Sequence, residues 1–190
     1  MVIECRFHAR GGQGNVVLTE LMVWAFHEGG KMSQGFPFFS FERRGAPATA
    51  YVRIGEERVL HREVAATADI VGVLDAGLVE TIPWYQGLKE GGMAVLNTKR
   101  APDEVRVPVK LSRVGVVDAT GLGFEVFGTT RGLGIPPTNT AILGAFVKTT
   151  GLLKLDHAIN AIKHKWRGRI ADLNVKAVTT AYERTQVGRF

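Results

Sequence analysis

A glycine-rich turn near the N-terminus is the first part of the sequence whose residues could carry chemistry. Gly11, Gly12, Gln13 and Gly14 separate a segment rich in β-forming residues from a stretch with helical spacing. Backbone N–H groups in such a turn can approach a phosphate, and the N-terminus of the following helix favours its negative charge. A tight turn that only permits close packing would use the same residues. The spacing alone leaves both interpretations open.

The same turn carries an incomplete dinucleotide fingerprint. A Rossmann fingerprint requires a third glycine where this chain has Val17, and an acidic residue at the end of a second strand. No clear acidic residue stands at that place. A stand-alone nucleotide-binding oxidoreductase is therefore an alternative that lacks part of its motif.

A pair of arginines is the second candidate. Arg43 and Arg44 follow Glu42 in a segment with several aromatic residues. Their guanidinium groups could bind a phosphate or pair with the carboxylates of a partner protein. Alternatively, Glu42 pairs with one of them and only fastens the loop, and such pairs contribute little to stability when they are exposed.

Two aspartates stand where the active sites of parallel sheets lie. Asp75 and Asp118 each end a short apolar run that is typical of a buried strand. Each is also followed by a small residue and an expected helix, so we expect both to cap helices. Ser33 and Ser40 have no neighbouring base, and the sequence shows no Ser–His–Asp or Cys–His arrangement. We therefore expect no catalytic residue in this chain.

The sequence contains few side chains that could bind a metal ion or an iron–sulfur cluster. Cys5 is the only cysteine, so the chain cannot supply the thiolates of an iron–sulfur cluster. The histidines are scattered, which argues against a zinc site: His8, His27, His61, His157 and His164.

The composition is that of an ordinary globular protein with a basic surface. Hydrophobic residues make up 45% and charged residues 22% of the 190 positions, and the formal net charge is +6. Such a charge attracts acidic partner subunits and phosphorylated cofactors as well as polyanions. The densest basic patch, residues 163–169, is either a solvated helix end or a contact surface. Only this patch interleaves basic and aromatic residues, so we expect no nucleic-acid partner.

The N-terminal residues read directly as a strand and not as a signal peptide. No stretch is long and apolar enough to span a bilayer. We therefore expect a cytoplasmic protein without membrane contact.

Apolar periodicity predicts the elements that position these residues. Strands are expected at residues 2–8, 48–54, 70–74, 93–96 and 114–117, and helices at 16–25 and 78–88. Residues 48–54 are expected to form a β-hairpin with residues 58–61. The segment 31–45, with its glycines, proline and aromatic run, is not expected to be regular throughout.

The last third of the chain is expected to be helical. Thr138 should cap a helix that ends at Gly151, and Asp156 should cap a second helix through residue 165. Asp172 or Asn174 should begin a third helix that runs to residue 184.

The alternation of strands and helices predicts a single α/β domain over residues 1–190. We expect a three-layer, Rossmann-like architecture in which a largely parallel, mixed sheet is covered by helices on both faces.

Four motifs occur along the chain in a fixed order. They are Gly11-Gly-Gln-Gly14, Gly35-Phe-Pro37 leading to Glu42-Arg-Arg-Gly-Ala-Pro47, Asn139-Thr-Ala-Ile-Leu-Gly-Ala145, and a final helix with Asn174 and Ala181-Tyr-Glu183. Together they resemble the gamma subunit, or gamma domain, of the pyruvate and related 2-oxoacid:ferredoxin oxidoreductases, and the resemblance covers nearly the whole chain. One departure is Ser40-Phe41, where family members often have Gly-Pro before the Glu-Arg-Arg core.

The resemblance implies a chain that works inside a larger enzyme. The family oxidatively decarboxylates a 2-oxoacid with coenzyme A and yields an acyl-CoA, carbon dioxide and reduced ferredoxin. Thiamine diphosphate and 4Fe–4S clusters carry that chemistry, on alpha/beta-type and ferredoxin-like delta-type partner subunits. The substrate would be pyruvate or a related oxoacid such as an aryl glyoxylate, and the sequence does not select among them.

For this chain the resemblance implies a non-catalytic, structural role with a coenzyme A contact. Gly12, Gln13 and Gly14, next to Gly11, would offer backbone or amide donors. Arg43 and Arg44 would add positive charge. A purely structural subunit that only assembles the catalytic ones is the alternative within the same family.

Overall fold

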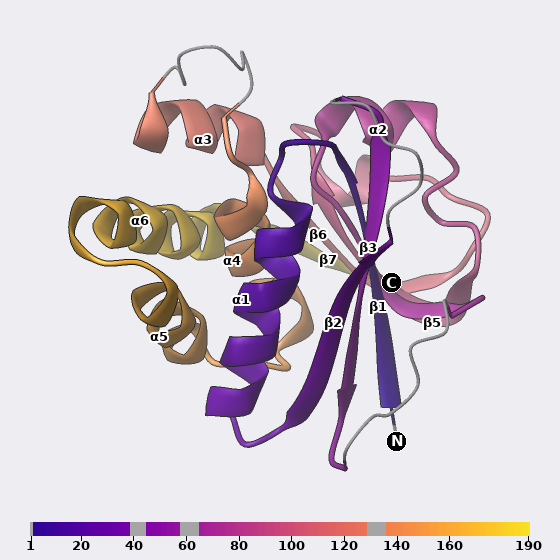
Figure 1. Cartoon of the computed structure of the whole chain (residues 1–190). Coiled ribbons are helices and arrows are strands. Elements are labelled where there is room, and N and C mark those ends of the chain that lie inside the picture. Colours follow the sequence, from indigo (N-terminus) through magenta and orange to yellow (C-terminus); the bar gives the residue numbers. More distant parts are fainter. Residues whose placement is uncertain (1, 39–44, 58–64, 129–135) are drawn as a thin grey trace.

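The structure is a computed structural model that describes residues 2–38, 45–57, 65–128 and 136–190 (Figure 1). Its strands form one sheet in the order β2-β3-β1-β4-β5-β6-β7. In chain order they are β1 (Val2–Arg10), β2 (Met32–Phe38), β3 (Pro47–Gly55), β4 (Ala68–Val73), β5 (Leu88–Asn97), β6 (Leu111–Val117) and β7 (Gln186–Arg189). The four strands β1, β4, β5 and β6 run parallel, and β2, β3 and β7 join antiparallel at the two sides.

Helices cover the two faces of the sheet unequally (Figure 1). One face carries α1 (Asn15–Glu28), α3 (Ala119–Phe127), α4 (Asn139–Thr150), α5 (Leu155–Lys165) and α6 (Gly168–Arg184). The other carries the short α2 (Ala76–Thr81) and the 98–110 segment with its 3-10 turn η1 (Pro102–Glu104). Within the described residues, no helix combines the length and the apolarity needed to cross a membrane.

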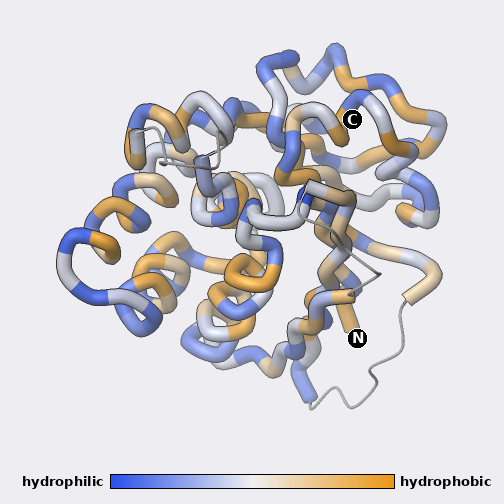
Figure 2. The backbone as a smooth tube through the Cα atoms, turned by 45° about the horizontal axis from the view of Figure 1, so that its top comes forward, coloured by the Kyte–Doolittle hydropathy of each residue, from blue (hydrophilic) through white to orange (hydrophobic). Residues whose placement is uncertain are grey.

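Each face of the sheet has its own hydrophobic core. Beneath the five helices, the ring of Phe146 on α4 lies 6.1 Å from that of Phe7 on β1 and 6.2 Å from that of Phe26 on α1. In the second core, Leu78 and Trp84 pack against the face of the sheet that carries α2. In Figure 2 the helices at the left, α5 and α6, show hydrophobic and hydrophilic stretches in turn, as amphipathic helices must when one side packs inward.

The chain leaves neighbouring parallel strands toward opposite faces at two places. After β1 and β6 it enters helices on the α1 face, whereas after β4 and β5 it enters segments on the α2 face. The β1/β4 and β5/β6 pairs are therefore topological switch points, where the carboxyl ends of the strands leave a crevice suited to ligands. The glycine turn lies at the first of them.

This architecture confirms the predicted fold class, a largely parallel mixed sheet with helices on both faces. The strands expected around residues 2–8, 48–54, 70–74, 93–96 and 114–117 are all present. The hairpin partner expected at residues 58–61 lies outside the described residues. In the structure, β3 pairs with β1 on one side and with β2 on the other.

The first half of the chain contains one strand that was not predicted and one helix whose end was predicted wrongly. The strand is β2, which is held by antiparallel pairing with β3 and by the stacking of Phe36 on Tyr51 at 5.4 Å. The helix expected at 78–88 stops at Thr81, two residues before Pro83, and β5 begins at Leu88. Proline explains the early stop because the residue before it disfavours the helical conformation.

The C-terminal helices are present; α4 begins at Asn139 as predicted, whereas α5 and α6 begin at other residues than predicted. Asp156 lies in the first turn of α5, whose N-cap is Lys154, and α6 begins at Gly168 instead of Asp172 or Asn174. Thr138 is the N-cap residue of α4, although its side chain makes no capping hydrogen bond within the described residues. The short strand β7 was not predicted.

The alternation of β1 places one half-buried titratable residue, His8, on the face of the sheet opposite the helices around α1. Cys5 and Phe7 point into the core under the helices, so Arg6 and His8 lie on the other face. Burial, and secondly the charge of Arg6, lower the pKa of His8 from 6.5 to about 4. Its buried Nε2 has no hydrogen-bond partner among the described residues. The His8 imidazole is therefore neutral in the folded protein at neutral pH.

We expect His8 to make the protein less stable as the pH falls from 6.5 to 4. The unfolded chain takes up a proton on His8 in this range and the folded chain does not, so acid favours unfolding. The contribution is complete above pH 6.5, is lost on acidification, and amounts to about 3 kcal/mol at most. Urea unfolding in buffers across this range measures it, and His8→Leu should flatten the dependence. An unchanged pH slope in that variant would show that another group is responsible.

Candidate functional site

The glycine turn has a backbone shape that suits glycine. Gly12 and Gly14 have φ values of 96° and 84°, in the left-handed region. Gly14 is the N-cap of α1, and no side chain among the described residues caps this helix. The turn is closed by a hydrogen bond from the Gln13 N–H to the Arg10 carbonyl, at 3.1 Å. The first turn of α1 thus begins directly at the carboxyl end of β1.

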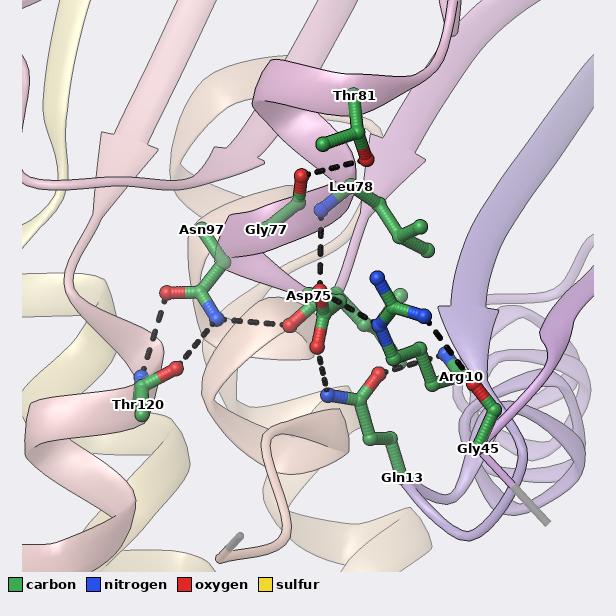
Figure 3. Close-up of polar contacts among 10 residues, drawn as sticks. Arg10, Gln13, Gly45, Asp75, Gly77, Leu78, Thr81, Asn97 and Thr120 are labelled. Atoms are coloured by element: carbon green, nitrogen blue, oxygen red, sulfur yellow. Dashed lines mark hydrogen bonds and ion pairs between the residues drawn. The ribbon is translucent and has the colours of Figure 1, made fainter.

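The amide nitrogen and the amide oxygen of the Gln13 side chain both form hydrogen bonds within the protein (Figure 3). Its Nε2 donates to Oδ2 of Asp75 at 2.6 Å, and its Oε1 accepts from the Arg10 backbone N–H at 2.7 Å. Gln13 is only 4% exposed. Since its carboxamide and its backbone N–H are both engaged within the protein, Gln13 holds the turn in place.

Asp75 connects this turn to the neighbouring strand. It follows β4, and its Oδ1 accepts from the Leu78 N–H at 3.0 Å, which confirms the predicted capping of α2. The same oxygen lies 3.3 Å from Nε of Arg10. Asp118 caps α3 in the predicted way by accepting from the Gly121 N–H at 2.8 Å. Asp75 therefore has a second role that its position in the sequence did not indicate.

The chain after the arginine pair returns to the glycine turn. The Gly11 N–H donates to the Ala46 carbonyl at 2.9 Å, and Arg10 donates through NH1 to the Gly45 carbonyl at 3.2 Å. Arg43 and Arg44 themselves lie outside the described residues. The structure nevertheless places Gly45, the residue that follows them, against Gly11.

A cavity of about 290 Å³ lies beside the turn. Its lining is mostly backbone and apolar side chains, with one guanidinium group: Arg10, Gly11, Gly12, Gly14, Asn15, Val16, Pro37, Phe38, Ala48 and Thr49. Three of the predicted site residues, Gly11, Gly12 and Gly14, therefore line this cavity. Arg10 was missed by the sequence reasoning, and its place directly before the glycines at the end of a strand was the available signal.

A second polar network lies further along the same end of the sheet (Figure 3). Asn97, fully buried at the end of β5, donates through Nδ2 to the Leu74 carbonyl at 2.7 Å and to the Thr120 hydroxyl at 2.8 Å. Its Oδ1 accepts from the Thr120 N–H at 3.3 Å. Asn97 therefore fixes the start of α3 against the ends of β4 and β5, and no motif had singled it out.

In the part of the chain that the structure describes, no thiol or metal-ligand cluster lies near the turn. Cys5 is fully buried in the core, where burial raises the pKa of its thiol and keeps it unreactive. Among the described residues, no three His, Cys, Asp or Glu side chains come together as a metal site would require. What the turn offers is a preformed shape with backbone N–H groups and one cation, which suits binding.

Alanine at Gly14 should destabilise the protein more than alanine at Gly12. Both positions have left-handed backbones, which cost an L-residue about 1–2 kcal/mol. A Cβ at Gly12 would meet nothing within 4 Å, whereas a Cβ at Gly14 would stand 2.7 Å from Nδ2 of Asn139. Gly14→Ala should therefore cost about 1 kcal/mol more, measured by denaturant unfolding. Equal losses in the two variants would mean that Asn139 does not constrain this position.

Comparisons with known proteins show the family of the chain. The sequence profile of the family described as pyruvate ferredoxin/flavodoxin oxidoreductase matches residues 4–184. The pyruvate/ketoisovalerate oxidoreductases common subunit gamma of Thermococcus kodakarensis is 42% identical over 188 residues, 98% of each chain. The pyruvate synthase subunit PorC of Methanothermobacter marburgensis is 43% identical over 183 residues, 96% of this chain and 97% of its own.

Solved structures show the same fold. The PORC subunit of pyruvate oxidoreductase from Thermotoga maritima superimposes with a TM-score of 0.82 at 31% identity and 99% coverage of both chains. The 2-oxoglutarate:ferredoxin oxidoreductase of Magnetococcus marinus has a TM-score of 0.70 at 17% identity, over 96% of this chain and 30% of that one, a likeness of fold alone. The resemblance read from the four sequence motifs is thereby confirmed, and the chain belongs to the pyruvate ferredoxin/flavodoxin oxidoreductase family.

Proposed function

We propose that this chain is the gamma subunit of a cytoplasmic, multisubunit 2-oxoacid:ferredoxin or acceptor oxidoreductase. The complex converts pyruvate or a related 2-oxoacid, with coenzyme A, to an acyl-CoA and carbon dioxide. The gamma chain, a single domain over residues 1–190, is non-catalytic. It holds the catalytic subunits together and contacts coenzyme A.

The observation that carries this proposal is the full-length match to gamma and PorC subunits at about 40% identity. Those relatives are named as subunits that act on pyruvate, and in one case also on ketoisovalerate. A branched-chain oxoacid is therefore a stronger second substrate than an aryl glyoxylate. The substrate pocket itself belongs to partner subunits in this proposal.

The division of chemistry among subunits also supports it. Thiamine diphosphate and 4Fe–4S clusters would supply decarboxylation and electron transfer from alpha/beta-type and delta-type partners. This chain has a single cysteine, and Cys5 is buried in the core. It therefore cannot furnish the several thiolates that a cluster needs.

The glycine turn supports the coenzyme A contact. Coenzyme A has charged phosphates at one end and a neutral amide arm at the other. The cavity beside Gly11, Gly12 and Gly14 offers the uncapped N-terminus of α1 and the Arg10 guanidinium to an anion, and apolar walls to an arm. Arg43 and Arg44 precede Gly45, which lies against Gly11, so they are proposed to add charge at the same place.

Two alternatives make different demands. A stand-alone nucleotide-binding oxidoreductase needs a complete fingerprint, which Val17 interrupts, and an acid–base pair. A purely structural gamma subunit needs neither the turn nor the arginines for activity. The two experiments below separate these alternatives from the proposal.

Purification from the native source should yield a complex. We expect a thiamine-diphosphate-binding subunit and a cysteine-rich, ferredoxin-like subunit to co-purify with this chain, identified by mass spectrometry. The isolated chain should not oxidise 2-oxoacids, whereas the complex should reduce ferredoxin with pyruvate and coenzyme A. Turnover by the isolated chain would overturn the proposal.

Removal of the two arginine side chains should weaken coenzyme A binding. Arg43→Ala combined with Arg44→Ala removes charge-assisted contacts to phosphate, so the affinity of the assembled complex should fall roughly tenfold or more. Isothermal titration measures it. Arg106→Ala with Arg189→Ala is the matched control, because both side chains are exposed and Arg189 lies on β7, at the opposite edge of the sheet from β2. Equal affinities in the natural and Arg43/Arg44 complexes would remove the charge part of the proposal.

A further inference from the structure

The guanidinium group of Arg10 is held by two segments that lie far apart in the sequence (Figure 3). Its Nε donates to Oδ1 of Asp75, which follows β4, at 3.3 Å. Its Nη1 donates to the carbonyl of Gly45, which precedes β3, at 3.2 Å. A guanidinium is planar and rigid, so bonds at two of its nitrogens fix the plane in which it lies. The side chain of Arg10 is therefore oriented before a ligand binds.

The backbone of Arg10 is fixed as well. Its N–H donates to Oε1 of Gln13 at 2.7 Å, and its carbonyl accepts from the Gln13 N–H at 3.1 Å. Gln13 in turn donates through Nε2 to Oδ2 of Asp75 at 2.6 Å. One oxygen of the Asp75 carboxylate thus holds the side chain of Arg10, and the other holds its backbone through Gln13.

This arrangement leaves part of the guanidinium available to a ligand. Arg10 lines the cavity beside the glycine turn, and its side chain is 35% exposed. Within the described residues only its Nε and Nη1 donate hydrogen bonds, although a guanidinium carries donors on all three nitrogens. The side chain of Asp75 is 11% exposed, and Asp75 is not one of the described residues that line the cavity. The cation therefore faces the cavity and the carboxylate lies behind it.

The negative charge of Asp75 needs an explanation of its own. Its Oδ1 caps α2, but asparagine caps a helix as well as aspartate does. A carboxylate beside Arg10 also reduces the attraction of that cation for an anion. What the carboxylate adds is orientation, because it accepts from Arg10 and from Gln13 at the same time. An ordered guanidinium binds phosphate oxygens without the entropy cost of first fixing a long side chain.

We propose that Asp75 is the positioning residue of the coenzyme A site, and that it orients the Arg10 guanidinium to contact a phosphate of the ligand from the wall of the cavity. This inference rests on the proposed function, in which the chain contacts coenzyme A. It goes further by separating the residue that touches the anion from the residues that orient it, Asp75 and Gln13.

The first test removes the charge of Asp75 and keeps its shape. Asp75→Asn can still cap α2, but its carboxamide N–H group meets the donating Nε2 of Gln13. In the assembled enzyme the affinities for coenzyme A and for adenosine 3′,5′-bisphosphate should fall about three- to tenfold, because a charge-assisted contact loses its geometry. Pantetheine, which has no phosphate, should keep its affinity. Isothermal titration measures all three ligands, and in steady-state kinetics the KM for coenzyme A should rise while the KM for pyruvate stays the same.

A second variant restores the network with its donor and acceptor exchanged. In Asp75→Asn combined with Gln13→Glu, position 75 donates to position 13, and the new carboxylate still accepts from the Arg10 backbone N–H. Position 75 keeps an oxygen for the Arg10 side chain. The affinity for coenzyme A should return to within about twofold of the natural enzyme, whereas two independent structural defects would add.

Two further variants complete the set. Asp118→Asn is the matched control, because Asp118 caps α3 as Asp75 caps α2 and belongs to the other switch point. It should leave coenzyme A affinity unchanged. Arg10→Lys keeps the positive charge but cannot contact Asp75 and Gly45 together, so the affinity should fall about tenfold. This variant leaves the Asp75 carboxylate intact, and it decides the question if Asp75→Asn does not assemble.

The outcomes separate this inference from the proposed function. If Arg10→Ala weakens coenzyme A binding while Asp75→Asn or Arg10→Lys does not, charge alone suffices and the inference is overturned. It is also overturned if pantetheine loses as much affinity as the bisphosphate, because the whole site would then have changed. If neither Arg10→Ala nor the combined Arg43 and Arg44 variant alters the affinity of any ligand, the coenzyme A contact of the proposed function fails as well.

Discussion

The buried carboxylate of Asp75 is the interaction on which the rest of the site depends. It is 8% exposed and receives three kinds of donor: the Leu78 backbone N–H, the Gln13 carboxamide and the Arg10 guanidinium. A charge at this depth is tolerated only when its oxygens are well bonded, as these are. Because these donors come from the end of β1, from the turn that follows it and from α2, the carboxylate holds the glycine turn against the start of α2.

The same kind of hydrogen-bonded arrangement occurs at two places along the carboxyl ends of the parallel strands. Two switch points open at the carboxyl ends of the parallel strands, one held by Asp75 and the other by Asn97. Asn97 holds the start of α3 against the end of β4 through hydrogen bonds to the Leu74 carbonyl and to Thr120.

The sequence was a good guide where a pattern depends on local constraints. Periodicity located the parallel strands, and Asp75 and Asp118 were recognised as caps because capping requires a short acceptor at a helix start. The β2 strand was missed because Gly35 and Pro37 favour turns, and only pairing with β3 overrides that preference. The contacts of Arg10, of Asn97 and of Asn139 with Gly14 were missed for one reason. Their roles depend on residues 65, 23 and more than 120 positions away, which no local pattern reveals.

The two edge strands of the sheet affect how readily the isolated chain could pair with strands of other molecules. Among the described strands, β2 and β7 each pair on one side only, and an unpaired edge invites association with other strands. β7 is only four residues long, and β2 contains Pro37, which has no N–H to offer a neighbour. Both edges are thus poor templates for strand addition. The described edges of the sheet therefore offer little backbone with which a second copy of the chain could pair.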